Sequence, residues 1–474
     1  DRCTTIAVGP GATVDGSSMN TYNADCSECD FRVNKVPAKD WAPGSLRPVY
    51  QTYSPYPARV RNDRGHTWRA DNLEDLPQRE EWEDYAPSQT ILGYIPQVNH
   101  TYALFEGMYS IMNEHQVGMG ESTCAAKLWA APAGYKGIKN GTALLEINEL
   151  SQIALERSRT AREAIQIMGD LAMQYGYYSC AWDVSFLPEI LQMPYAEGEA
   201  GEALTVIDPY EAWMFHISAD DTGSKAIWAA QRLPDDHIAV CANTFVIREI
   251  DPDSDDFMYS DNLWSVAKKM GWWDESMGKL DFLKTYAPQR YHPNYSTKRV
   301  WSVFNRAAPS LALPFNTNAW GDDYPFSVKV EKPLSHYDVF NMARDVYEGT
   351  PFDTTEGRAG GPYGDPNRWD PGAWGNMTVW DTLQVRAGEF PRTISIFRTS
   401  YSTVNQARRA VPDFLSLSWL AMYAPDQSIY IPVYVNAKTL PTEYTTGAMH
   451  QYNSSSAWWN TCVVGNYVSR FYHF

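Results

Sequence analysis

Cys3 lies close to the amino end of the sequence, where a thiol can combine its chemistry with that of a main-chain amine. The α-amine of a first residue titrates at about 8 and a cysteine thiol at about 8.5. If Cys3 were the first residue, its own amine could therefore accept the proton of its thiol. One residue would then supply both a nucleophile and a base for attack on a carbonyl carbon.

Asp1 and Arg2 stand before Cys3 in this sequence. While the Arg2–Cys3 peptide bond is intact, the Cys3 nitrogen is an amide without a basic lone pair. The chemistry therefore requires cleavage of that bond, either by the chain itself or by a trypsin-like protease that cuts after arginine. A chain that keeps the bond is expected to be inactive.

Other patterns that carry chemistry are weak or missing. Cys26-x-x-Cys29 has the spacing of half a zinc or redox motif, but no second cysteine pair or His-x3-His follows, so part of a disulfide framework is favoured. The sequence has no His-Glu-x-x-His, phosphate-binding glycine loop or Gly-x-Ser-x-Gly. We expect no metal and no cofactor.

The elements around Cys3 are expected to be strands. Residues 4–8 and 18–22 flank a glycine-bearing turn and predict a hairpin, and two helices are predicted at 142–158 and 160–175, the second ended by Gly176. Strands are predicted at 203–207, 212–217, 225–230, 393–398 and 429–435, and at 237–250 with an interruption around Asn243. Further helices are predicted at 263–270 and 335–347. We interpret residues 1–474 as one domain with loop insertions near 40–98 and 349–376.

Several stretches resemble, in the same order, the dipeptidase A family of N-terminal-nucleophile (Ntn) cysteine hydrolases, to which the secernins are related. The resemblance begins in the segment from Cys3 to Asp25 and covers the chain to about residue 435. The other stretches that carry it are residues 112–121, 154–164, 208–213, 324–328, 347–353 and 400–402. Agreement of several blocks in order is more specific than any single motif.

This resemblance implies an α+β fold, an αββα sandwich of two stacked, mainly antiparallel sheets with flanking helices. It implies a cysteine-type dipeptidase that hydrolyses small peptides through an acyl-enzyme on Cys3. Asp25 matches the acid beside the nucleophile's amine, and Asn113 matches an amide donor to the oxyanion. Asn243 and Arg299 match related Ntn positions. Many Ntn relatives carry arginine three residues before the acid, where this chain has Tyr22.

The alternative function is a catalytically inactive Ntn-fold protein that binds glycans or proteins outside the cell. The sequence has 18 tryptophans and 30 tyrosines, and the pairs Trp272-Trp273 and Trp458-Trp459 are candidate contact surfaces. Assembly into a homo-oligomer stays open. Core packing accounts for most of these aromatic residues.

Charge and modification motifs indicate a compartment. The net charge of −18 disfavours nucleic acid and anionic membranes as partners, and the longest apolar run, 414–425, is too short to span a bilayer. Six cysteines besides Cys3, together with five glycosylation sequons, favour secretion or a lysosomal or vacuolar lumen, with some disulfides and a signal peptide removed before Asp1. The sequons lie at Asn99, Asn140, Asn294, Asn376 and Asn453.

Overall fold

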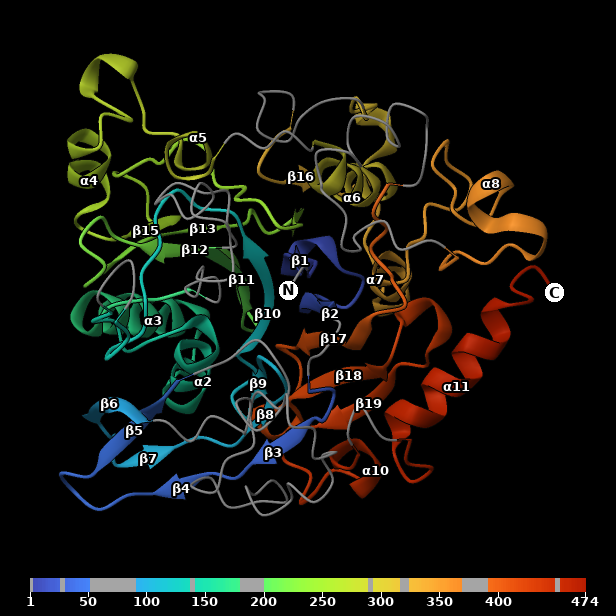
Figure 1. Cartoon of the computed structure of the whole chain (residues 1–474), viewed down its shortest axis with the longest axis horizontal. Helices are drawn as coiled ribbons and strands as arrows, with labels where there is room; N and C mark the ends of the chain where they lie inside the picture. Colours follow the sequence, from blue (N-terminus) through green and yellow to red (C-terminus); the bar gives the residue numbers. More distant parts are fainter. Residues whose placement is uncertain are drawn as a thin grey trace.

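Two large antiparallel sheets stack against each other, with helices on both outer faces (Figure 1). The structure is a computed structural model that describes residues 3–25, 30–51, 91–136, 141–179, 200–288, 293–315, 324–368, 391–447 and 452–474. The arrangement confirms the predicted α+β sandwich. The single-domain interpretation stays a prediction.

The first sheet has seven strands and contains the amino-terminal hairpin near its centre. In spatial order its strands are β16 (Val328–Lys329), β14 (His237–Cys241), β1 (Thr5–Val8), β2 (Ser18–Asp25), β17 (Thr399–Ala407), β18 (Leu417–Met422) and β19 (Ile431–Tyr434). A strand from the middle of the chain, β14, and one from its carboxyl-terminal part, β17, therefore pair directly with the hairpin.

The second sheet has eight strands, and its centre faces β1 and β2. Its spatial order is β15 (Phe257–Tyr259), β13 (Ala226–Arg232), β12 (Ala212–Ala219), β11 (Gly201–Ile207), β10 (Gly118–Cys124), β9 (Ser110–Asn113), β8 (Leu104–Glu106) and β3 (Asn34–Val36). Two short ribbons lie apart from it, β4 (Lys39–Asp40) with β7 (His100–Thr101) and β5 (Leu46–Tyr50) with β6 (Ile91–Pro96).

Helices form the two outer layers. Helices α2 (Ile147–Arg157) and α3 (Ala161–Tyr175) lie on the eight-stranded side, and α6 (Pro293–Ala307) and α7 (His336–Ala343) lie on the seven-stranded side (Figure 1). Helix α3 begins where the Thr160 hydroxyl accepts a hydrogen bond from Glu163 N and ends at Gly176, with φ 77°. The other α-helices within the described ranges are α4 (Leu263–Lys269), α5 (Phe282–Tyr286), α8 (Gly357–Gly360), α10 (Thr442–Thr445) and α11 (Ala457–Ser469).

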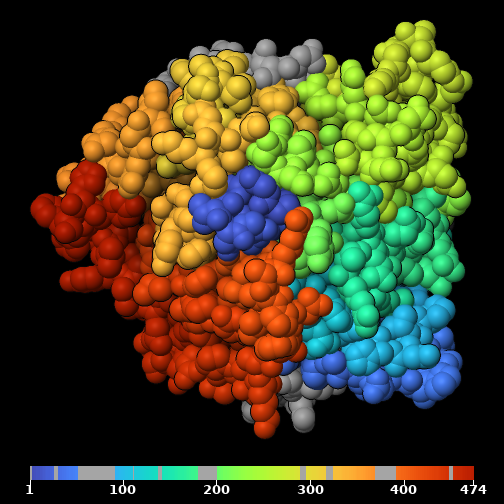
Figure 2. All heavy atoms as spheres, turned by 180° about the vertical axis from the view of Figure 1, so that it is seen from behind, coloured from blue at the N-terminus to red at the C-terminus, as the bar shows by residue number. Residues whose placement is uncertain are grey.

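Alternation along β1 directs its side chains to different layers. Ile6 and Val8 pack with apolar residues of α6 and α7, whereas Cys3 and Ala7 belong to the core cluster that includes residues of both sheets. The turn of the hairpin, residues 9–17, reaches the surface, where Figure 2 shows the blue segment surrounded by yellow, green and orange ones. Cys3, at the opposite end of the hairpin, is buried.

The sheets meet closely at Gly120 of β10. The Thr5 and Thr205 hydroxyls, one from each sheet, lie 2.6 Å apart. A Cβ atom at Gly120 would lie only 2.1 Å from the Thr21 carbonyl oxygen and 2.6 Å from Thr5 Oγ1. Glycine is therefore required here for close approach of the sheets.

We expect Gly120→Ala to force the sheets apart and to lower the free energy of unfolding by about 1–3 kcal/mol, the usual cost of overpacking. Because the nearest atom belongs to the Thr21 backbone, a side-chain rotation cannot relieve the contact. Urea denaturation followed by tryptophan fluorescence measures the change. An unchanged midpoint would contradict this close contact.

Sequence patterning located most elements but misplaced several. The hairpin, the α2–α3 pair and the strands β11 to β13 are confirmed, although α2 begins at Ile147 and not at residue 142. The strand predicted at 393–398 is wrong, because strand geometry begins only at Thr399. Helix α6 was missed, and the strand predicted at 237–250 ends at Cys241.

Cysteines and sequons are only partly described. No disulfide joins two described cysteines, and Cys124 Sγ and Cys241 Sγ lie 3.6 Å apart, beyond the S–S bond of about 2.05 Å. Cys26, Cys29, Cys180, Asn140 and Asn376 lie outside the described residues, as does the side chain of Asn294. Asn99 is exposed and Asn453 is half-buried. No helix in the described ranges is long and apolar enough to cross a membrane.

Candidate active site

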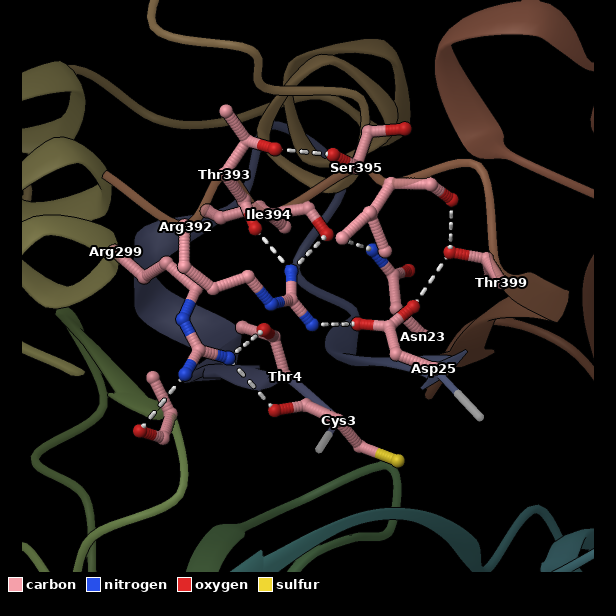
Figure 3. A network of polar contacts seen from close by, with 12 residues as sticks. Cys3, Thr4, Asn23, Asp25, Arg299, Arg392, Thr393, Ile394, Ser395 and Thr399 are labelled. Atoms are coloured by element: carbon pink, nitrogen blue, oxygen red, sulfur yellow. Dashed lines mark hydrogen bonds and ion pairs between the residues drawn. The ribbon is translucent and has the colours of Figure 1, made fainter. Parts of the chain in front are cut away.

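Cys3 lies just before β1, at a point where both sheets and α6 meet. Its carbonyl oxygen accepts hydrogen bonds from Arg299 Nη1 at 2.9 Å and from Ser122 Oγ at 3.2 Å. In Figure 3 the sulfur points away from this carbonyl and from the Arg299 guanidinium. The main chain of Cys3 is thus held from two sides while its thiol faces another direction.

The Cys3 thiol is protonated at neutral pH in this environment. Burial, followed by the negative charges of Glu121 and Asp25, raises the pKa of the thiol well above its ordinary value. The Tyr22 hydroxyl oxygen lies 3.6 Å from Sγ and accepts a hydrogen bond from the thiol. Because the thiolate does not form by itself, attack on a carbonyl requires a base next to the sulfur.

Asp25, the last residue of β2, is held by an arginine from a distant part of the chain. Arg392 Nη2 forms a fully buried ion pair with Asp25 Oδ2, and the Thr399 hydroxyl donates to Asp25 Oδ1 (Figure 3). Burial disfavours the charge on Arg392, but Asp25 reverses this and raises the pKa of the guanidinium. The Asp25 carboxylate is therefore fixed in place beside Cys3.

Arg392 supplies a positive charge beside Asp25. The sequence has Tyr22 at the position, three residues before this acid, where many Ntn relatives carry an arginine. A second nitrogen of the Arg392 guanidinium, Nη1, donates to the carbonyl oxygens of Thr393 and Ile394. The Asn23 amide also bonds to the Ile394 carbonyl, at 3.3 Å, which ties this segment to β2 (Figure 3). The irregular path of residues 392–398, which excluded the predicted strand, is what turns the guanidinium toward Asp25.

Arg299 and Asn243 complete the group of residues around Cys3. Arg299 lies on α6 and donates to Thr4 Oγ1 at 2.8 Å and to Asn243 Oδ1 at 2.8 Å. Asn243 follows β14 in the left-handed conformation, φ 60°, which asparagine tolerates better than most residues. Its Nδ2 donates to the Thr123 carbonyl at 2.7 Å. Burial lowers the pKa of Arg299 to about 10, so the guanidinium stays charged at neutral pH.

Asn113 does not join this group, which corrects the expectation of an oxyanion donor there. Its Nδ2 donates to the Leu155 and Ser158 carbonyls at 2.9 and 2.8 Å, and its Oδ1 accepts from His115 N and Val117 N. Both amide hydrogens are therefore used to hold the β9–β10 turn against the end of α2. Four residues of β10, roughly 13 Å of strand, separate this turn from Ser122 beside Cys3.

The structure thus brings together Cys3, Asp25, Asn243 and Arg299 and leaves out Asn113. Sequence reasoning missed Arg392, which stands 367 positions after Asp25. The one available signal was indirect. With Tyr22 in place of arginine, a buried Asp25 needs a cation from elsewhere, but this need does not identify the residue.

No group of three or more His, Cys, Asp or Glu side chains in the described part of the chain is arranged to hold a metal ion. The residues around Cys3 instead offer a thiol, a fixed carboxylate, two guanidinium groups and an amide. These groups are suited to acyl transfer with stabilisation of a developing negative charge.

Comparison with known sequences gives a family match. The sequence model of peptidase family C69 matches residues 107–474, a region that contains Asn243, Arg299 and Arg392 but begins after Cys3 and Asp25. The matched region is more than half of the chain.

Individual relatives carry dipeptidase names. A probable dipeptidase of Salmonella dublin is 28% identical over 290 residues, 60% of this chain and 54% of the relative. A probable dipeptidase of Latilactobacillus sakei is 24% identical over 447 residues, 93% of this chain and 76% of the relative. A probable dipeptidase B of Streptococcus pyogenes is 22% identical over 406 residues, 83% of this chain and 71% of the relative. The chain therefore spans about half the length of the Salmonella protein and about three quarters of the others.

Proposed function

The chain belongs to peptidase family C69, and from this premise we propose that it is a dipeptidase that cleaves small peptides through an acyl-enzyme on Cys3. The observation that carries the proposal is the convergence on Cys3 of the Asp25–Arg392 ion pair and the Asn243–Arg299 contact. The dipeptidase names of the relatives support the substrate class.

In this mechanism the Arg2–Cys3 bond is first cleaved, which frees the Cys3 amine. The amine takes the thiol proton, the sulfur attacks the peptide carbonyl, and a tetrahedral oxyanion forms. The same amine then returns the proton to the leaving nitrogen, the carbon–nitrogen bond breaks, and the second amino acid of the dipeptide departs while the first stays bound to the sulfur as a thioester. Water, deprotonated by the Cys3 amine, hydrolyses the thioester and restores the thiol. Asp25, held by Arg392, stabilises the protonated amine between these steps.

Asn243 is the candidate oxyanion donor in place of Asn113. One hydrogen of its amide donates to the Thr123 carbonyl, and the second is bonded to no residue that the structure describes. Its acceptor oxygen is held by Arg299, which fixes the orientation of the amide. A fixed donor beside the attacked carbonyl stabilises the oxyanion without reorganisation during the reaction.

We expect Asn243→Gly to lower kcat by about 10²- to 10³-fold, the usual effect of removing one oxyanion donor. Glycine removes the amide but accepts the left-handed backbone at φ 60°, so it is a better test than alanine. Steady-state kinetics on a dipeptide measures the effect, with urea denaturation as the check on folding. An unchanged kcat in a folded variant would contradict the assignment.

The proposal is tested with protein whose first residue is verified by mass spectrometry. Protein that begins at Cys3 should release free amino acids from members of a broad dipeptide panel, and protein that keeps Asp1-Arg2 uncleaved should not. If protein that begins at Cys3 hydrolysed no dipeptide of the panel, the proposal would be refuted. That result would favour the alternative, an inactive protein that binds through its surface aromatics.

A further inference from the structure

Glu121 on β10 is a buried carboxylate beside Cys3 that the proposed mechanism does not use. Its side chain is fully buried. Oε1 accepts a hydrogen bond from Thr123 Oγ1 at 2.8 Å. Oε2 is buried and, among the residues described, has no hydrogen-bond partner of good geometry, although the Glu202 carboxyl and the Cys3 thiol lie close enough to lower the pKa of Glu121 against the effect of burial. The next residue, Ser122, bonds to the Cys3 carbonyl, and the Glu121 charge is the second largest cause of the raised pKa of the Cys3 thiol. The carboxylate therefore lies at the nucleophile.

A buried carboxylate of this kind lacks a positive partner within the described ranges. Among the described residues no lysine or arginine forms an ion pair with Glu121, and a second carboxyl, that of Glu202, lies next to it. Burial raises the pKa of Glu121. Isolated buried charge is costly unless a cation and hydrogen-bond donors satisfy it. The arrangement is suited to a ligand that carries a positive charge and hydrogen-bond donors, such as an ammonium group.

Two tyrosines, Tyr22 and Tyr109, lie close enough to this carboxylate to be affected by its charge, and the Tyr22 hydroxyl also accepts the hydrogen bond from the thiol. The Tyr22 ring packs edge to face on Tyr109 and Tyr401, with centroids 5.7 and 5.6 Å away. After burial, the Glu121 charge is a leading cause of the raised pKa of Tyr109, and it also raises the pKa of Tyr22. Aromatic rings beside a carboxylate form a favourable environment for an ammonium group.

Asp25 is not the candidate for this role, because Arg392 already neutralises its charge and the proposed mechanism assigns it to the Cys3 amine. In a dipeptide the protonated α-amino group lies on the carbon next to the carbonyl that a nucleophile attacks. A group that binds this ammonium must therefore lie next to the nucleophile itself. Glu121 is the carboxylate in that position with an oxygen still able to accept hydrogen bonds.

We propose that Glu121 binds the protonated α-amino group of the substrate and so restricts cleavage to the first peptide bond of peptides with a free amino terminus. The inference rests on the proposed function, since it assigns the substrate group that lies beside the acylated thiol. Glu121 is then a residue that determines specificity, while Asp25 serves the amine of Cys3.

The test compares two reagents that alkylate Cys3, alanine chloromethyl ketone and its N-acetyl derivative. Protein that begins at Cys3 should be alkylated faster by the free amine form. In Glu121→Gln the ratio of the two labelling rates should fall by at least about 30-fold. This factor corresponds to the smallest loss of binding free energy that is usual when one partner of a buried charge pair is removed. The labelling rate at Cys3 is followed by peptide mass spectrometry.

The matched control is Glu114→Gln on the same β9–β10 hairpin. Glu114 is half-buried, and its Oε1 accepts from Ala103 N at 2.9 Å, a bond that glutamine can keep. The control should retain the full preference of the wild type. Competition of wild-type labelling by alaninamide, but not by N-acetylalaninamide, is expected as well and needs no variant.

Two outcomes overturn the inference. Equal labelling of the wild type by both reagents would exclude recognition of the substrate amine by Glu121. An equal loss of both labelling rates in Glu121→Gln would exclude it as well, and would mean that Glu121 acts on the reactivity of the Cys3 thiol. Failure of the proposed function gives a different result. The wild type would then show the labelling preference and yet hydrolyse no dipeptide.

Discussion

Cys3→Ala, in protein that begins at residue 3, should hydrolyse dipeptides at least about 10⁴-fold more slowly than the wild type, as is usual when a covalent nucleophile is removed. The variant keeps the terminal amine, the Asp25–Arg392 ion pair and the Asn243–Arg299 contact. It lacks only the sulfur that forms the acyl-enzyme. The loss should therefore fall on kcat, because the groups that bind substrate stay in place.

Amino acid release from the best dipeptide of the panel measures this loss, and intact mass after brief reaction should show an acyl adduct in the wild type alone. Cys462→Ala on α11 is the matched control, because Cys462 is a half-buried thiol outside the site. It should retain wild-type turnover. Substantial hydrolysis by pure Cys3→Ala would mean that another group acts as nucleophile.

Arg392→Met should lower the free energy of unfolding by about 3–5 kcal/mol, the cost of leaving one partner of a buried ion pair without the other. Both side chains are fully buried, so water cannot replace the guanidinium at Asp25. The carboxylate would then take up a proton or turn away from Cys3, and turnover should fall together with stability. Chemical denaturation and dipeptide kinetics measure the two effects.

Two further variants distinguish the loss of this ion pair from the general effect of removing an arginine side chain. Arg162→Met removes an arginine that is 40% exposed and paired with Glu211, and should cost at most about 1 kcal/mol. Adding Asp25→Asn to Arg392→Met removes the stranded charge and should restore part of the stability but none of the activity. Full stability of Arg392→Met alone would contradict the buried pair.

Local patterns predicted the elements that short-range chemistry controls. The amino-terminal hairpin and the α2–α3 pair follow from alternating apolar residues, a glycine-bearing turn and the Thr160 cap, each of which acts within a few residues. Helix α6 was missed although it carries Arg299. Arg299 was named as a candidate without its element, because a family resemblance does not depend on periodicity.

The sequence by itself predicted the sandwich fold, which the structure confirms. It also supplied Cys3 as the proposed nucleophile and Asp25 as its proposed acid, because both residues and the hairpin between them are local in the chain. Only the tertiary structure decided which cation meets Asp25 and which amide lies beside Cys3. Arg392 reaches Asp25 because β17 pairs with β2, and Asn243 reaches Cys3 because β14 pairs with β1. Asn113 is excluded since its amide closes a turn far along β10. Such contacts depend on strand pairing across hundreds of residues, which no short-range propensity encodes.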